Sequence, residues 1–221
     1  MRARYCAPVL RARGLTTVGE REARRYAGTV TATWRETQKA NRRAHLLERA
    51  AALFAERGFA AVTTVELGEA VGMSGPALYR HFANKEAILA ELLVDASERL
   101  LEGCRTILAG DAASAVDRLD ELIRFHIGFA VEAPDIIRIQ DRELAGLPAA
   151  TSHRVRELQR TYVAEWDAVL AAARPELAAE ERRVRLLGTF GLLNSTPHSA
   201  RGAGAEAERV LARMAHHALL G

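Results

Sequence analysis

The sequence is poor in aromatic residues, in cysteine and in long apolar runs. Its only cysteines, Cys6 and Cys104, are far apart, which excludes a disulfide framework and the spacing of a metal site. No stretch approaches the roughly 18 consecutive apolar residues of a membrane-spanning helix. The apolar stretches of the Arg-rich N-terminus are too short for the core of a signal peptide. We therefore expect a cytoplasmic protein that needs no membrane, metal or cofactor.

Runs of β-branched residues are also rare, whereas Ala, Leu, Arg and Glu, which favour helices, are plentiful. Hydrophobic residues make up 49% of the 221 residues and charged residues 27%. These are ordinary values for a globular protein with a real core. The composition predicts an all-α fold, as one large domain or as a small domain joined to a medium one.

The charge is distributed unevenly along the chain. Residues 1–41 carry nine basic and three acidic side chains, residues 42–90 are close to neutral, and residues 91–221 carry a net charge of −4. A basic N-terminal side is compatible with nucleic-acid binding, although basic tails are often only solvated. Residues 1–41 lack a sustained apolar period, so we expect a flexible arm, partly helical around residues 20–26. Such an arm either reaches the DNA minor groove or is solvated, or it is extra coding sequence before the natural start.

Regular helical spacing begins after this arm. Apolar residues recur from Ala44 to Phe54, and Gly58 ends that helix. Thr63 and Glu66 have the spacing of a capping box, which predicts a second helix beginning there. Gly72 suits the C-terminal cap of that helix, because a left-handed backbone costs least without a Cβ.

Two further helix starts follow within a few residues. Ser74 suits the cap of a short third helix that has Pro76 in its first turn, where a missing N–H costs little. Asn84 suits the cap of a fourth helix, and Glu86 in its first turn favours the helix dipole. The first three helices, with a tight turn between the second and the third, predict a helix-turn-helix.

The residues of this segment closely resemble the DNA-binding domain of the TetR family of transcriptional regulators. The resemblance spans roughly residues 42–90 and rests on many positions at fixed spacing, namely Thr63-Thr64-Val65, Leu67, Ala70, Gly72-Met73-Ser74, Pro76, Leu78-Tyr79, His81-Phe82, Asn84-Lys85-Glu86 and Leu89. Two departures are minor: Gly68 stands where Ala is usual, and Pro76 where Gly is commoner.

The resemblance implies which residues contact an operator. Thr64 and Lys85 would meet phosphates at two helix starts, and Tyr79 and His81 would bond mainly to the DNA backbone. The full set of implied DNA contacts is Thr64, Gly75, Pro76, Ala77, Tyr79, Arg80, His81 and Lys85. By themselves, Tyr79 and His81 would better suit the core of an ordinary helical hairpin, but within the full motif DNA contact is favoured.

For residues 91–221 the resemblance implies a helical domain that binds an effector and forms a homodimer. Helices are predicted over residues 85–108, 113–131, 135–144, 151–172, 177–194 and 205–219. The last two carry apolar faces that would form a four-helix interface between two copies. The alternative is that these faces belong to a monomeric core.

The middle helices would enclose a small, mostly apolar effector, with an acyl-CoA as the sharper hypothesis. The candidate effector residues are Leu122, His126, Arg138, Arg142, Tyr162 and Trp166. Arg138 and Arg142 would bind a CoA phosphate or, equally, form a surface salt-bridge network. His126 would also suit a hydrogen-bonded core position. Asn194 and His198 either line a pocket or merely end a helix, and we favour the second.

Two other functions fit the sequence less well. Gly72-Met73-Ser74-Gly75-Pro76 begins like a nucleophile elbow, but it lacks the final Gly and does not follow a strand. The histidines have no metal-binding spacing, so an enzyme is disfavoured. A helical interaction protein that has lost DNA binding is the other alternative, and the intact set of DNA-contacting residues argues against it. The sequence therefore predicts a ligand-responsive DNA-binding regulator, most simply a repressor.

Overall fold

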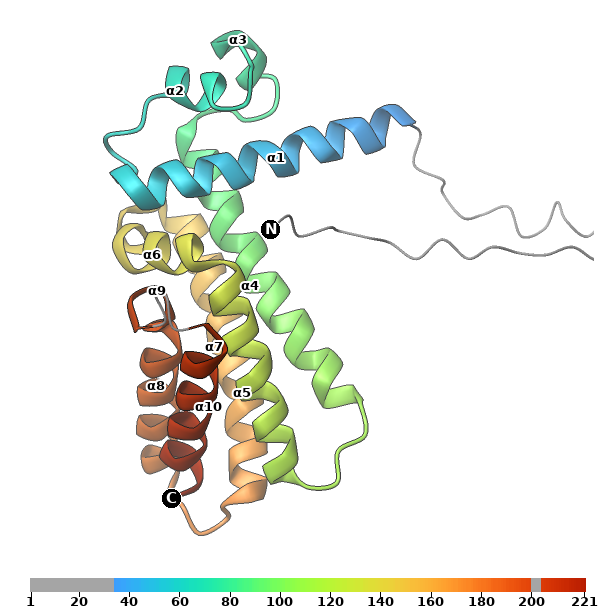
Figure 1. Cartoon of the computed structure of the whole chain (residues 1–221), viewed down its shortest axis with the longest axis vertical. Coiled ribbons are helices and arrows are strands. Elements are labelled where there is room, and N and C mark those ends of the chain that lie inside the picture. Colours follow the sequence, from blue (N-terminus) through green and yellow to red (C-terminus); the bar gives the residue numbers. More distant parts are fainter. Residues whose placement is uncertain (1–33, 200–203) are drawn as a thin grey trace, which may run out of the picture. The chain divides into compact units, whose positions relative to one another are not determined.

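The computed structural model describes residues 34–199 and 204–221, with side chains from residue 41 onward apart from residues 75 and 76. The described residues are helical and contain no strand, which confirms the predicted all-α fold. The elements, shown in Figure 1, are α1 (Trp34–Arg57), α2 (Thr64–Glu69), α3 (Gly75–Leu78), α4 (Lys85–Ala109), α5 (Ala115–Glu132), α6 (Pro134–Glu143), a 3₁₀ helix (Leu144–Gly146), α7 (Ala149–Ala173), α8 (Ala179–Asn194), α9 (Thr196–Ser199) and α10 (Gly204–Leu220).

The capping residues predicted between α1 and α4 occupy helix ends in the structure. The side chain of Thr63 accepts a hydrogen bond from the backbone of Glu66 (3.3 Å), and Glu66 accepts one from the backbone of Thr63 (2.7 Å). These bonds and the nearby Arg57 hold the pKa of Glu66 at about 2. Gly72 has a φ of +66°, the left-handed conformation that favours glycine. Asn84 caps α4 by accepting from the backbone of Ala87 (2.8 Å).

The first helix differs from its prediction. It begins at Trp34, inside the segment predicted as an arm, so residues 34–41 belong to α1. The predicted partial helix at residues 20–26 and the rest of the arm lie outside the described residues. The six later helices lie within two residues of their predicted limits. The 3₁₀ helix and α9 were not predicted, because neither is long enough to show a hydrophobic period.

Residues 41–221 form one compact unit with two hydrophobic cores. One core, which we call the N-terminal core, joins the helices α1, α2, α3 and α4. It also takes in Ile139 of α6, Val155 of α7 and Leu147, which precedes α7. The other lies among α4, α5, α7, α8 and α10. Helix α4 contributes to both, with Leu93 in the first and Leu101 in the second, and Figure 1 shows it running from α2 and α3 along α5 and α7. Any movement of α4 or α6 is therefore felt in the N-terminal core, because packed cores transmit displacements.

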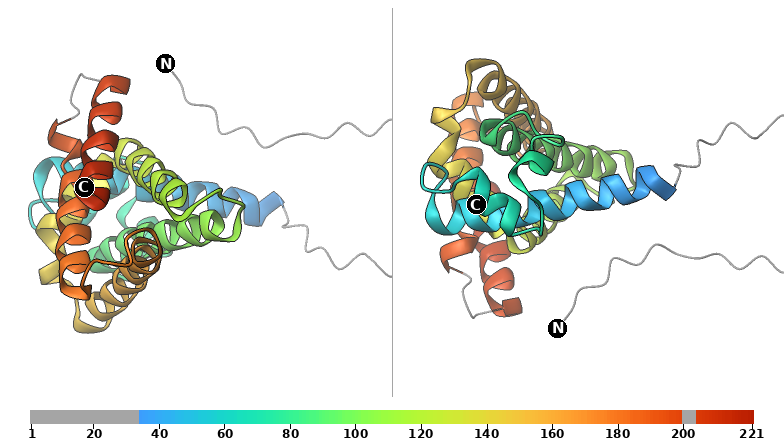
Figure 2. Two further views of the ribbon diagram at one scale, coloured as in Figure 1. Left: turned by 90° about the horizontal axis from the view of Figure 1, so that it is seen from below. Right: turned by 90° about the horizontal axis from the view of Figure 1, so that it is seen from above.

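The larger helices of the C-terminal part pack in pairs. Helix α4 packs against α7, α5 against α7 and α10, and α8 against α10. The last two lie side by side in both views of Figure 2. Helices α4 and α5 approach closely at Gly103, where an added Cβ would lie 2.1 Å from the ring of Phe125. None of the described helices is long and apolar enough to cross a membrane.

Candidate DNA-binding and effector sites

The residues around α3 form an exposed surface. The α-helix covers only Gly75–Leu78, and single-turn hydrogen bonds from Arg80, His81 and Phe82 continue it. The short helix predicted to begin at Ser74 is therefore one α-helical turn, prolonged as far as Phe82 by turn hydrogen bonds. Its buried residues Leu78 and Phe82 anchor the segment in the N-terminal core.

Three of the predicted DNA contacts that have polar side chains, Thr64, Tyr79 and Arg80, lie on this surface. Tyr79 is 52% exposed, and its hydroxyl donates to the hydroxyl of Thr64 (3.3 Å), the first residue of α2. Arg80 is also exposed and forms no ion pair with a described residue. Ala77 is half-buried, and the side chains of residues 75 and 76 lie outside the described set. The start of α2 and the residues that directly follow α3 thus present hydroxyls and one guanidinium together.

His81 is held more tightly than its neighbours. Its carbonyl oxygen accepts from Arg43 of α1 (2.8 Å), and the guanidinium of Arg43 lies over the ring of Phe82 (4.1 Å to the centroid). Arg43 is also paired with Glu91 of α4. The half-buried imidazole of His81 has an Nδ1 atom without a partner among the described residues. His81 therefore belongs partly to the packing between α1, α3 and α4.

The predicted phosphate contact of Lys85 conflicts with the bonds that this side chain forms. Its ammonium donates to the carbonyl oxygens of Phe59 (2.8 Å) and Val62 (2.9 Å) and lies 4.3 Å from the centroid of the Phe59 ring. An ammonium has three donors, and two of them hold the α1–α2 loop against α4. The structure gives Lys85 a positioning role, and a phosphate could use only its third N–H.

A second candidate site, which we call the inner pocket, lies inside the C-terminal part. Its volume is about 170 Å³, similar to the roughly 150 Å³ engineered cavity that takes up benzene. None of the described residues that line it is charged. The lining residues are Ala96, Ser97, Leu100, His126, Phe129, Ile136, Ile137, Gln140, Gln159, Tyr162, Val163, Leu187, Phe190 and Asn194.

One side of the inner pocket carries a chain of three polar side chains. The Nδ1 atom of His126 lies 3.0 Å from the hydroxyl of Tyr162, and Nε2 lies 3.1 Å from Oδ1 of Asn194. Burial lowers the pKa of His126 to about 4, so at neutral pH the ring has a single N–H. Nε2–H then donates to Asn194, and Nδ1 accepts from Tyr162. This leaves the amide N–H groups of Asn194 and the oxygen lone pairs of Tyr162 for a polar group of a ligand.

The structure places the predicted effector residues in two environments. His126 and Tyr162 line the inner pocket, whereas Leu122 and Trp166 lie in the adjoining core. Asn194, expected only to end a helix, is both the last residue of α8 and part of the lining. Gln140 and Gln159 were not predicted, because an isolated glutamine on a helix carries no signal of which neighbour it faces.

The predicted phosphate-binding role of the two arginines of α6 is not supported by their positions. Arg138 pairs with Asp135 (2.7 Å) and donates to the carbonyl of Pro197 (3.2 Å). Arg142 donates to the carbonyl oxygens of Phe54 and Ala55 at the end of α1 (2.7 and 2.8 Å). Neither lines the inner pocket. The alternative of a structural network is the better description.

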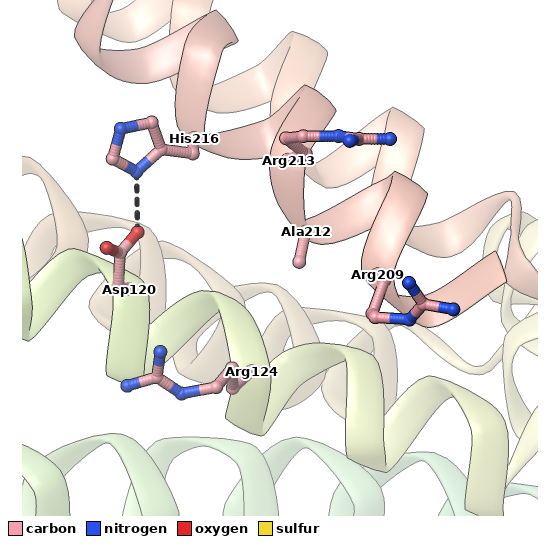
Figure 3. Close-up of a pocket in the computed structure, with 6 residues that line it drawn as sticks. All are labelled: Asp120, Arg124, Arg209, Ala212, Arg213 and His216. Atoms are coloured by element: carbon pink, nitrogen blue, oxygen red, sulfur yellow. Dashed lines mark hydrogen bonds and ion pairs between the residues drawn. The ribbon is translucent and has the colours of Figure 1, made fainter. Parts of the chain in front are cut away.

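A third hollow, between α5 and α10, has a volume of about 410 Å³ and is strongly basic. It is lined by Asp120, Arg124, Arg209, Ala212, Arg213 and His216. His216 is bonded to Asp120 (2.7 Å), and Arg209 is paired with Glu206. Figure 3 shows Arg124 and Arg209 pointing to opposite ends of the hollow, so their guanidinium groups do not converge on one anion.

Two family profiles match the chain over non-overlapping segments. The profile described as bacterial regulatory proteins of the tetR family matches residues 46–92. The profile described as the tetracyclin repressor-like C-terminal domain matches residues 112–221. Together they include the surface around α3, the helices α8 and α10, and the part of the inner-pocket lining that lies outside α4.

Individual relatives agree with these profiles. The transcriptional repressor KstR2 of Mycobacterium tuberculosis is 40% identical over 82 residues, which are 37% of this chain and 40% of that protein. The chain thus aligns with less than half the length of this curated relative. The solved structure of KstR2 is 26% identical, has a TM-score of 0.66, and matches over 80% of this chain and 93% of that one. A TetR-family regulator from Bordetella parapertussis is 26% identical with a TM-score of 0.75, over 81% of this chain and 94% of that one.

Proposed function

Because the chain belongs to the TetR family of bacterial regulatory proteins, we propose that it is a cytoplasmic repressor that binds a palindromic DNA operator as a homodimer. A small, mostly apolar effector then releases it from the DNA. Repression, rather than activation, is supported by the name of KstR2, the curated relative that matches the DNA-binding segment. Membership of a family of regulators, rather than any missing catalytic group, argues against the enzyme alternative.

The observation that carries the DNA-binding proposal is the exposure of Tyr79 and Arg80 beside the half-buried Thr64. Tyr79 and Arg80 leave the last turn of α3 toward solvent, beside the start of α2. Hydroxyls and a guanidinium gathered at the start of α2 and the end of α3 suit phosphate oxygens and the edges of bases. A helical interaction protein without DNA binding would have no use for this arrangement of small and polar residues.

Homodimer formation is supported by an exposed apolar face on α8 and α10. Val184 is 60% exposed and Met214 is 49% exposed, although both lie on long helices with well-packed opposite faces. Gly188 and Gly191 follow Val184 along the same side of α8, and a Cβ at either would meet nothing within 4 Å. Such a surface is self-complementary about a two-fold axis, and it would place two α3 surfaces on one duplex.

Effector release is supported by the position of the inner pocket beside α6. Ile136, Ile137 and Gln140 of α6 line the pocket, while Ile139 belongs to the N-terminal core and Arg142 bonds to the end of α1. A ligand that displaces α6 would therefore disturb α1. The ligand releases DNA only if it binds more tightly to the displaced arrangement than to the DNA-bound one.

The proposal is tested by selecting operators with the full-length protein from a library of random duplexes. We expect enrichment of a palindrome whose half-sites are about 10 base pairs apart or slightly more. A Tyr79→Ala/Arg80→Ala variant serves as the control and should enrich nothing. Lack of any enriched sequence, or the same enrichment by the variant, would contradict DNA binding through this surface.

A further inference from the structure

The inner pocket adjoins a groove on the outside of the molecule. This groove, which we call the α7–α8 groove, lies between those two helices and has a volume of about 660 Å³. Gln159, Val163 and Leu187 line both the groove and the inner pocket. These three side chains lie between the two spaces, so a ligand that displaces them would occupy both.

The α7–α8 groove is basic, whereas the inner pocket is neutral. Arg156, Arg160 and Arg183 line it, and its one acidic lining residue is Asp167. Asp167 is already bound by Arg182 through two bonds, of 2.8 and 3.3 Å. The groove therefore presents an excess of positive charge.

These three arginines form no strong ion pair with the described residues. Arg156 and Arg160 form no ion pair with any described residue, and they lie one helical turn apart on the side of α7 that faces α8. Arg183 reaches only Glu180 of its own helix (3.3 Å), and both of those side chains are mostly exposed. Exposed pairs of this kind contribute about 0–1 kcal/mol, so an anion can displace this one. Planar guanidinium groups match the oxygens of a phosphate.

From this adjacency, and building on the proposed function, we propose that the effector has two parts. An uncharged acyl group of about six to ten carbon atoms occupies the inner pocket, and its carbonyl oxygen accepts from the Asn194 amide. A phosphate-bearing head lies in the α7–α8 groove against Arg156, Arg160 and Arg183. The head is thus bound by α7 and α8, on helices that carry neither Arg138 nor Arg142.

The distribution of charged side chains explains why the phosphate-bearing head lies in the α7–α8 groove and not in the inner pocket. The inner pocket has no cation to balance an anion, and His126 is neutral at pH 7 because burial keeps its pKa near 4. Burying an unpaired anion there would be strongly unfavourable. A free acid would have to place its carboxylate either in that neutral space or in the groove without the reach of a larger head. The acyl ester of a phosphorylated carrier satisfies both spaces at once.

Isothermal titration calorimetry on the full-length protein tests this, with hexanoyl-CoA and decanoyl-CoA as probes. We expect at least one of them to bind, and to bind more than tenfold more tightly than CoA alone or the corresponding free acid. The Arg156→Ala/Arg160→Ala variant should lose at least tenfold in affinity for that acyl-CoA. Its loss should shrink as the salt concentration rises, because the head is bound electrostatically.

The matched control is Arg124→Ala/Arg213→Ala, which removes two arginines from the hollow between α5 and α10 and should leave the affinity unchanged. Equal binding of the free acid, unchanged affinity in Arg156→Ala/Arg160→Ala, or no binding of either acyl-CoA would overturn the inference. Because the heat of binding is measured without DNA, this result stands independently of operator binding. Failure of the operator selection alone would instead overturn the proposed regulator function.

Discussion

Lys85 at the start of α4 donates to the carbonyl oxygen of Phe59 (2.8 Å), and its ammonium lies 4.3 Å from the centroid of the same residue's ring. One cation thus satisfies the backbone and covers the ring of the loop residue that follows α1. Phe59 in turn packs edge-on against Phe54 in the N-terminal core (5.2 Å between centroids). The position of α4 relative to α1 depends on this side chain.

Replacing Lys85 should therefore affect stability as well as DNA binding. We expect Lys85→Ala to lower the free energy of unfolding by about 1–3 kcal/mol, because two backbone acceptors lose a charged donor. Urea denaturation measures this loss. The salt dependence of operator binding should change little, since two of the three donors are used internally. A drop of about one unit in the salt slope with unchanged stability would instead show a direct phosphate contact.

The exposed neighbours should behave in the opposite way. Arg80→Ala should weaken operator binding and lower the salt slope by about one unit if its guanidinium meets a phosphate. Tyr79→Ala should also weaken binding, because its ring and hydroxyl are 52% exposed on the same surface. Neither change should shift the thermal midpoint noticeably, since exposed positions contribute little to stability. Unchanged affinity in filter-binding titrations of both variants would move the DNA-contacting surface elsewhere.

Acid should destabilise the protein through His126. Its pKa is about 4 in the folded chain and 6.5 in the unfolded one, so below pH 6.5 protons bind preferentially to the unfolded state. Stability is therefore unaffected above pH 6.5 and falls between pH 6.5 and 4, by about 3 kcal/mol in all. Urea denaturation at pH 7 and pH 5 measures the loss. His126→Phe is the control and should show a smaller loss over that interval, and an equal loss would assign the effect to another group.

Charge placed on the exposed face of α8 and α10 should dissociate the dimer. Val184→Glu or Met214→Glu would bury an unpaired carboxylate between two copies, at a cost of several kcal/mol. Analytical ultracentrifugation should then show monomer at micromolar concentrations where the unmodified protein is dimeric. Val131→Glu is the matched control, because Val131 is a valine 40% exposed on α5. Dimers that persist in both α8 and α10 variants would place the interface on another surface.

Local structure near the DNA-binding surface could be predicted well because its signals are short-range. The bonds between Thr63 and Glu66, the cap at Asn84 and the left-handed Gly72 all depend on residues within a few positions. The limits of the long helices followed from apolar periodicity and from breaks at Gly and Pro. The start of α1 was missed because residues 34–41 are mostly polar, so no apolar period marks them.

The sequence by itself determined the helices, their caps and the motif of the DNA-binding segment, since these depend on neighbours along the chain. Only the tertiary structure decided what the long polar side chains do. An arginine or lysine can reach partners in many directions. Lys85 bonds to Phe59, which lies 26 positions away, and Arg142 bonds to Phe54, which lies 88 positions away. The same holds for Asn194, which reaches His126 across 68 positions. Periodicity shows which face of a helix is buried, but only packing shows which charged groups remain free for a ligand.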